Sequence, residues 1–198
     1  MQFDEVKRLV KQECKENGIR FYQGRGKTVA LQDGIKSNGY FDPGVDGATP
    51  TLAIAKGGNL ELLVHEFSHM RQYLERAAVW EALENNSKIW DWINGQDGFT
   101  EKDLDKSVVA YYNVEIDCER RTVAQFKEWN VDVNIPEYIQ KANAYTMFYF
   151  FMRDHRVWYT PGKEPYKLEK VWKSMPKTFT FDRVVCYNKI SHLFNHCI

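Results

Sequence analysis

The sequence predicts an α+β fold: a mostly helical single domain in which a short antiparallel sheet packs beside one long amphipathic helix. Two observations predict it. Strand-like segments are confined to residues 18–56, whereas helical patterns fill most of the remaining chain. The 198 residues are 43% hydrophobic and 15% aromatic, which is enough to bury the core of one domain. We expect residues 1–130 to carry the site and residues 131–198 to form a helical and irregular C-terminal subregion.

The first expected element is an amphipathic helix that ends near Gly18. Its apolar residues recur at helical spacing, at Phe3, Val6, Leu9 and Val10. Three strand-like stretches follow, at residues 18–31, 35–41 and 51–56. The turn signal Asp33-Gly34 separates the first two stretches, so we expect them to pair in a short antiparallel sheet.

The long amphipathic helix follows directly after the third stretch. Asn59 is a good N-cap, and neither Gly nor Pro interrupts the helical pattern over residues 59–83. Residues 100–103 resemble a capping box that opens a second long helix over residues 102–130. A third helix is expected over residues 138–152, and the tail beyond it is irregular except for a short last helix.

The charges of the chain are balanced, with 27 Lys and Arg residues against 27 Asp and Glu residues. This balance gives no reason to expect a nucleic acid or a membrane surface as partner. The longest apolar run is far too short to span a membrane, and the N-terminus lacks the apolar core of a secretory signal. The four scattered cysteines indicate reduced thiols. We therefore expect a cytoplasmic protein, and the sequence leaves its oligomeric state open.

The segment His65-Glu66-Phe67-Ser68-His69 has the H-E-x-x-H spacing of a zinc-peptidase helix. Residues four apart lie on one face of an α-helix, so His65 and His69 can direct two imidazole nitrogens at one Zn²⁺ ion. Glu66 is rotated about 100° from His65, which places its carboxylate beside the metal as a general base. Apolar neighbours bury part of this helix, where such polar side chains are costly without a bound ion.

A catalytic zinc site needs a third protein ligand. A third histidine six residues after His69 is excluded because Glu75 stands there. The better candidates are Glu115 and Glu119, one helical turn apart: one can bind zinc while the other holds the imidazole of a histidine ligand. The same two residues also fit a solvated, salt-bridged helix face, since two arginines follow them.

The two helices resemble the gluzincin group of zinc metallopeptidases, whose pattern is H-E-x-x-H followed on a later helix by E-x-x-x-D. The resemblance implies a minimal zincin-like domain that hydrolyses a peptide or protein substrate with a zinc-bound water. It makes His65, His69 and Glu115 the zinc ligands, Glu66 the general base and Glu119 the carboxylate behind a histidine ligand. Glu119 stands where the group has Asp, so the order of the two glutamates stays open. A weaker resemblance, on the two helices and the aromatic C-terminal half, is to uncharacterised H-E-x-x-H proteins of tailed phages.

Small gluzincins also carry an edge strand beside the zinc helix. The resemblance therefore makes residues 51–56 a candidate shelf that holds an extended peptide by strand addition. A plain buried strand fits the segment equally well. Donors for the charge that develops on the substrate oxygen are expected in the C-terminal half, among Tyr145, Tyr149, His155, Arg156 and Tyr159.

Two other functions fit the sequence. One is a non-catalytic interaction protein that zinc stabilises, with a closed site that Cys118 or Asp117 completes as fourth ligand. The other is a zinc hydrolase that acts on a non-peptide amide. It would use the same residues as a peptidase, so the sequence does not separate the two activities.

Overall fold

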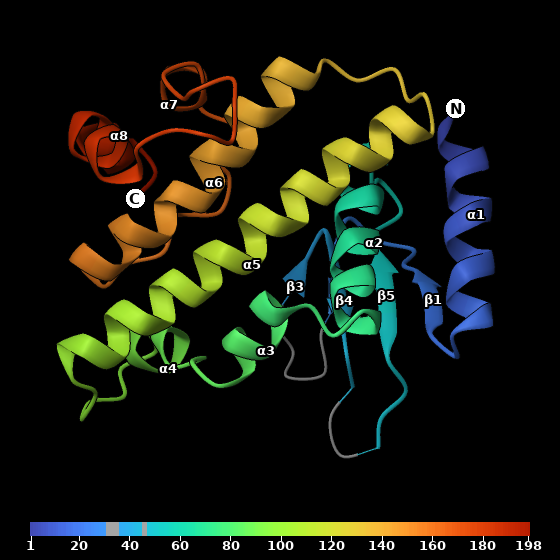
Figure 1. Cartoon of the computed structure of the whole chain (residues 1–198), viewed down its shortest axis with the longest axis horizontal. Coiled ribbons are helices and arrows are strands. Elements are labelled where there is room, and N and C mark those ends of the chain that lie inside the picture. The colour runs from blue at the N-terminus through green and yellow to red at the C-terminus, as the bar shows by residue number, and fades with distance from the viewer. Residues whose placement is uncertain (31–35, 45–46) are drawn as a thin grey trace. The chain divides into compact units, whose positions relative to one another are not determined.

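The computed structural model of the chain describes residues 1–30, 36–44 and 47–198 (Figure 1). These residues are mostly helical and carry a small mixed sheet, so the expected α+β class is confirmed. They divide into two compact units: residues 1–77 with 121–132, and residues 78–120 with 133–198. Within the described part of the chain, no helix combines the length and the apolar character that crossing a membrane requires.

The first unit contains a three-stranded sheet in the order β1-β5-β4. β1 (Arg20–Gln23) pairs with β5 (Thr51–Ile54) in parallel, and β4 (Gly39–Asp42) pairs with β5 antiparallel. The expectation of a purely antiparallel sheet is therefore wrong. β1 and β5 can run parallel because the long segment between them returns the chain to the same end of the sheet.

A separate two-stranded ladder in the first unit is antiparallel. β2 (Val29–Ala30) pairs with β3 (Lys36–Ser37), with Val29 opposite Ser37. The stretch at residues 18–31 is thus split between two sheets. The split falls at Gly24, where a Cβ atom would lie 2.7 Å from the Val29 side chain. The expected turn Asp33-Gly34 lies outside the described residues, as do Leu31, Gln32 and Ile35.

β5 is the middle strand of the sheet, and its four residues are at most 4% exposed. Both of its edges are paired, one with β1 and the other with β4. A substrate strand needs an unpaired edge, so residues 51–56 do not form a peptide-binding shelf. The buried-strand interpretation is right, and it agrees with the uninterrupted apolar run of this segment.

Two helices pack on the sheet in Figure 1. α1 (Phe3–Glu16) lies against β1 and α2, and α2 (Leu60–Leu74) lies against β4 and β5. The Asn59 side chain caps α2 by accepting a hydrogen bond from the Leu62 amide at 2.8 Å, as the sequence predicts. The most deeply buried residues of these elements include Val6, Val10, Leu52, Ile54, Leu63, Val64, Phe67 and Met70.

α2 ends at Leu74, well before the expected end near residue 83. Arg76 adopts a left-handed conformation with φ 50°, and the Ala77 amide donates to the Gln72 carbonyl at 2.9 Å. This hydrogen bond closes the last turn, and α3 (Ala78–Glu84) begins as a separate helix. Glycine or asparagine usually marks such an end, so a left-handed arginine gives no signal in the sequence.

The second unit is helical. It comprises α3, α4 (Ile89–Ile93), the first part of α5, α6 (Ile135–His155), α7 (Glu169–Trp172), α8 (Arg183–Ile190) and a 3-10 helix (Ser191–His196). α5 (Glu101–Glu128) is one unbroken helix that contributes residues to both units. The helices expected over residues 102–130 and 138–152 are therefore confirmed. So is the capping box, in which the Asp103 amide donates to Thr100 Oγ1 at 3.2 Å and the Thr100 amide donates to Asp103 Oδ2 at 3.3 Å.

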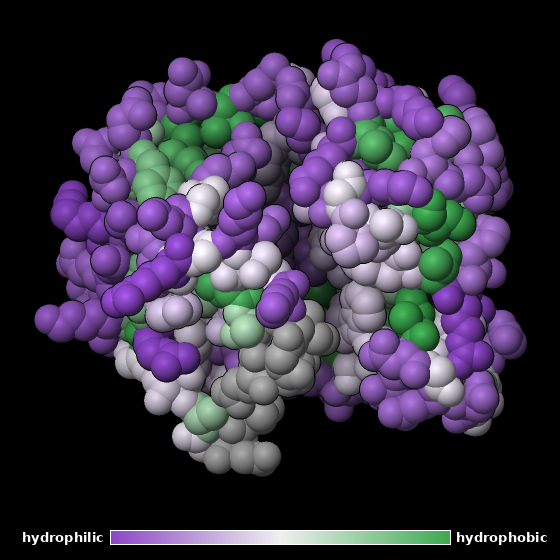
Figure 2. All heavy atoms as spheres, turned by 180° about the vertical axis from the view of Figure 1, so that it is seen from behind, coloured by the Kyte–Doolittle hydropathy of each residue, from purple (hydrophilic) through white to green (hydrophobic). Residues whose placement is uncertain are grey.

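Aromatic side chains fill the core of the second unit. Phe148 packs edge to face on Phe194 with ring centroids 5.4 Å apart, and both side chains are fully buried. On the face shown in Figure 2, polar and charged residues cover most of the surface, and apolar residues appear in small separate patches. Large exposed hydrophobic residues include Tyr22, Val184, Val185 and Ile198.

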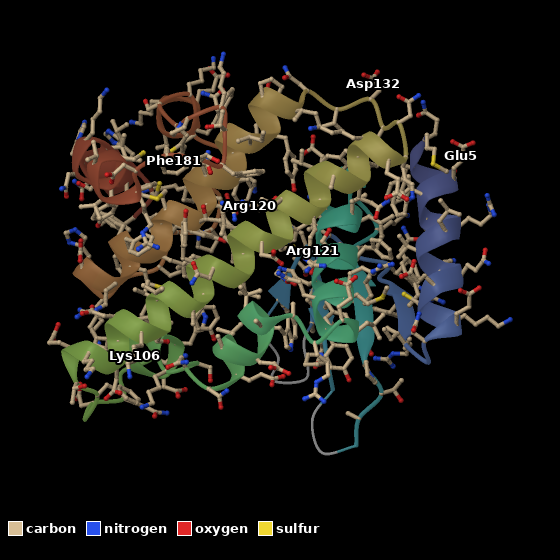
Figure 3. The ribbon with its side chains drawn as sticks, in the orientation of Figure 1. Glu5, Lys106, Arg120, Arg121, Asp132 and Phe181 are labelled. Atoms are coloured by element: carbon tan, nitrogen blue, oxygen red, sulfur yellow. The ribbon has the colours of Figure 1, made fainter. Side chains whose placement is uncertain are left out.

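Two consecutive arginines mark the point where α5 passes from one unit to the other (Figure 3). Arg120 donates to the Phe179 carbonyl at 3.3 Å, within the second unit. Arg121 forms an ion pair with Glu75 at 2.6 Å, within the first unit. Neighbouring residues of a helix point about 100° apart, so adjacent side chains can serve different units.

Candidate metal centre

α2 holds the two histidines of the H-E-x-x-H motif on one face. The rings of His65 and His69 lie edge to face, with centroids 4.7 Å apart and planes at 89°. Their spacing of four residues places one imidazole a helical turn above the other. Both residues are half-buried, so α2 brings two imidazoles together while leaving them partly accessible.

His69 has a hydrogen-bond partner on its own helix. Its Nδ1 atom lies 2.8 Å from Oε1 of Gln72, which is fully buried. The contact fixes the orientation of the His69 ring on the helix. Sequence reasoning missed this role of Gln72, and the available signal was its position three residues after His69, on the same face of the helix.

Glu66 is a buried carboxylate next to the first histidine. The residue is 6% exposed, although glutamate is among the residue types that are seldom buried. Its position in the helix puts it in the same turn as His65. A buried carboxylate on the helix that carries two imidazoles is a candidate proton acceptor.

Behind the motif, α2 is tied to residues 121–128 of α5. Thr122 Oγ1 donates to Ser68 Oγ at 2.9 Å, and Ser68 Oγ donates to the Val64 carbonyl at 2.8 Å. Thr122 and Ser68 are 0% and 2% exposed. The hydrogen bond from Arg121 lowers the pKa of the Glu75 carboxyl at the end of α2. The C-terminal part of α5 is thus fixed against the helix that carries the histidines.

The second unit contains the two glutamates that the sequence selects. Glu115 and Glu119 lie one turn apart on α5 and are 9% and 5% exposed. Glu119 accepts a hydrogen bond from the Tyr138 hydroxyl at 2.5 Å. Glu115 accepts a longer one, at 3.5 Å, from the Tyr149 hydroxyl. Two carboxylates buried in this way do not lie on a solvated helix face, which was the alternative interpretation.

Tyrosines of α6 surround Glu115. The Tyr145 hydroxyl lies 3.2 Å from that of Tyr149, and the Tyr111 ring stacks on the Tyr149 ring with centroids 5.7 Å apart. Burial, followed by the negative charge of Glu115, raises the pKa of Tyr145 and Tyr149 well above 10. These phenols therefore stay protonated at neutral pH and remain hydrogen-bond donors.

The five donors expected in the C-terminal half have different surroundings. Tyr145 and Tyr149 belong to the group around Glu115 just described. His155 packs on Phe151 with ring centroids 4.1 Å apart, and Arg156 donates to the carbonyl of Trp92 at 2.9 Å. His155 and Arg156 therefore close the C-terminal end of α6. Burial is also the main cause that raises the pKa of Tyr159.

The predicted site residues thus lie on two helices. His65, Glu66 and His69 are on α2 in the first unit, and Glu115 and Glu119 are on the part of α5 that belongs to the second unit. Cys118, a buried thiol, lies between the two glutamates along α5 and adds a third potential metal ligand to this helix.

The sequence matches no protein-family model and has no significant match among curated proteins or solved structures. Function is therefore inferred from the side chains of α2 and α5 themselves.

Proposed function

We propose that the chain is a zinc-dependent metallopeptidase of the gluzincin type, with His65 and His69 as zinc ligands and Glu66 as general base. One observation carries the proposal. α2 presents two imidazoles one turn apart, with ring centroids 4.7 Å apart, on the helix that carries the buried Glu66. Two histidines with a carboxylate or a thiolate form a donor set that suits zinc.

Zinc would supply Lewis acidity, which lowers the pKa of water and polarises the carbonyl of the peptide bond. Glu66 accepts a proton from the water as the water oxygen bonds to the carbonyl carbon. It then gives this proton to the amine nitrogen as the C–N bond breaks. The protonated phenols of Tyr145 and Tyr149 are candidate donors to the oxygen on which negative charge develops.

We propose that α5 supplies the third ligand. Thr122 is fixed to Ser68 on α2, and α5 runs without a break from Glu115 through Cys118 to Thr122. Positions 115, 118 and 122 share one face of a helix, because they are spaced by three and four residues. Glu115 and Cys118 therefore precede Thr122, the residue that contacts α2, on the same face of α5.

Glu115 is the first choice for this ligand, with Glu119 as the carboxylate behind a histidine. Both glutamates are buried and receive hydrogen bonds from tyrosines, which would hold them in one orientation. Cys118 is the alternative, because a thiolate is a common zinc ligand and Cys118 lies one turn after Glu115 on the same face of α5.

Cys118 also favours a second function, a zinc-stabilised interaction protein without catalysis. If Cys118 and Glu115 both bound the ion together with the two histidines, all four positions of a tetrahedral site would be filled. Water could then not bind, and the site would only stabilise the fold. A zinc hydrolase of a non-peptide amide would instead keep the open site and differ only in its substrate.

The peptidase proposal is tested by incubating the zinc-loaded protein with a mixed peptide library. We expect cleavage that a chelator abolishes and added zinc restores. His69→Ala should lose both the metal and the activity. His192→Ala is the matched control, since His192 is an exposed histidine outside α2, and it should retain both. Cleavage that persists after the metal is removed would contradict the proposal.

The third ligand is identified by replacing zinc with cobalt(II). A thiolate ligand produces an intense charge-transfer band in the near ultraviolet, and a carboxylate ligand does not. We expect no such band in the wild type and loss of cobalt in Glu115→Ala. A band that disappears in Cys118→Ser would assign Cys118 instead, and a band together with loss of cobalt in Glu115→Ala would indicate the closed four-ligand site.

A further inference from the structure

The second unit contains a cavity of about 430 Å³ that the start of α6 and the segment around α7 line together. Its volume falls in the range of about 300–1,000 Å³ that is typical of ligand sites. Pro136 on one side and Lys173 and Lys177 on the other are exposed, so the cavity is open to solvent. An open cavity of this size suits a segment that passes through it better than a small molecule that must be enclosed.

Gln140 forms a buried part of the cavity wall and is 7% exposed. Its amide nitrogen donates to the carbonyls of Met175 at 2.8 Å and Lys173 at 3.2 Å. Two carbonyl oxygens can only accept, so these contacts fix which end of the amide is the nitrogen. No residue in the described part of the chain donates to the amide oxygen. Gln140 therefore keeps an unused acceptor at the cavity.

Trp172 lines the same cavity and is 9% exposed. The ammonium groups of Lys141 and Lys173 lie over its ring, 5.3 and 5.4 Å from the centroid. Each of these lysines also has an ion pair at 2.6 Å, with Glu137 and Glu169 respectively. The indole N–H donates to none of the described residues, although a buried indole usually finds an acceptor. Trp172 therefore keeps an unused donor.

Lys177 supplies the charge of the site. It is exposed, and it forms no ion pair within residues 1–30, 36–44 and 47–198, whereas Lys173 is already paired. The cavity thus combines an uncompensated ammonium group with one buried acceptor and one buried donor. A peptide group offers one N–H and one carbonyl, which matches the acceptor and the donor. A side-chain carboxylate matches the ammonium group.

We propose that this cavity binds an acidic peptide segment. Gln140 accepts a hydrogen bond from a peptide N–H, Trp172 donates to a peptide carbonyl, and Lys177 pairs with a carboxylate of the peptide. The site consists of residues of the second unit alone and shares none of them with the candidate metal centre. It therefore does not depend on the proposed metallopeptidase function.

The test uses metal-free protein and a short capped peptide of alternating glutamate and glycine. Nitrogen-15 NMR locates the peptide by the indole resonance of Trp172, assigned by its absence in Trp172→Phe, and calorimetry measures the affinity. We expect this resonance to shift saturably with the acidic peptide, and a matched peptide with glutamine for glutamate to bind at least about fivefold more weakly.

Three variants test the assigned contacts. Lys177→Met removes the charge at similar length and should weaken binding about two- to fivefold. Trp172→Phe removes the N–H and should weaken it about two- to tenfold. Lys170→Met is the matched control, because Lys170 is an exposed lysine of α7 outside the cavity, and it should bind as the wild type does.

Equal affinity for the acidic and the neutral peptide would overturn the proposal, and so would wild-type affinity in Lys177→Met. Inorganic phosphate is the probe for a site of small anions. If it shifted the Trp172 resonance and displaced the peptide at equal concentration, the peptide assignment would be wrong. If Trp172→Phe does not fold, calorimetry on Lys177→Met beside Lys170→Met decides the question.

Discussion

Replacing Thr122 with valine should destabilise the protein by about 1 kcal/mol. Valine keeps the shape of threonine but lacks the hydroxyl that donates to Ser68 Oγ at 2.9 Å, where both residues are almost fully buried. A buried hydrogen bond between neutral groups contributes about 1 kcal/mol net. A buried polar group that is left without a partner costs up to about 3 kcal/mol. The loss in Thr122→Val should stay below that value because Ser68 keeps its own hydrogen bond to the Val64 carbonyl.

The assay is denaturant unfolding of the wild type, Thr122→Val, Ser68→Ala and the double variant, all free of metal. A double-mutant cycle isolates the energy of the contact between the two side chains, and we expect a coupling of about 1 kcal/mol. A coupling indistinguishable from zero would refute the inference that this pair of hydroxyls holds α5 against the helix of the histidines. It would also remove the physical support for a third ligand from that face of α5.

Two further predictions concern charge and ligand orientation. The hydrogen bond from Arg121 is the main cause that lowers the pKa of Glu75 below its ordinary 4.5. This ion pair therefore stabilises the folded state above pH 4.5. The stabilisation is lost as the pH falls through the lower pKa that Glu75 has in the folded state. Glu75→Gln should therefore flatten the acid side of a stability-against-pH curve measured by denaturant unfolding, and a curve as steep as that of the wild type would contradict the assignment. Tyr149→Phe removes the hydroxyl that points at Glu115 and should weaken zinc binding in a chelator competition, whereas Tyr187→Phe, whose hydroxyl donates to another carboxylate at 2.6 Å, should not. Equal zinc affinity in the two tyrosine variants would show that Tyr149 does not orient a ligand.

The long helices could be predicted from the sequence because their signals are local. The reciprocal cap at Thr100 and Asp103 and the apolar periodicity behind it locate α5, and the Asn59 cap locates the start of α2. Each of these signals depends on residues within one or two turns. A single sequence therefore contains the information needed to place them.

The sheet and the end of α2 could not be predicted in the same way. The pairing of β5 with β1 on one side and β4 on the other joins segments far apart in the chain, and the alternation of residues says little about which strand becomes central. Arg76 ends α2 in a left-handed conformation that its residue type does not indicate. The candidate edge strand, β5, is consequently the most buried strand of the sheet.

For the site, the candidate residues could be selected from the sequence, but the contacts that hold their side chains in place could not. The four-residue spacing alone places His65 and His69 together on α2. The contact of Gln72 with His69 depends on the side-chain rotamers of two residues, which no spacing rule specifies. The choice between Glu115 and Cys118 depends on how α5 is rotated about its own axis, which a sequence pattern does not fix.

The most direct test of the central claim is the rate of peptide hydrolysis by zinc-loaded Glu66→Gln beside that of the zinc-loaded wild type. Glutamine has nearly the same shape as glutamate but cannot accept the proton, so we expect zinc content to be unchanged and the rate to fall by at least about a hundredfold. Hydrolysis by Glu66→Gln at the wild-type rate, with zinc bound, would contradict the assignment of α2 as a catalytic helix.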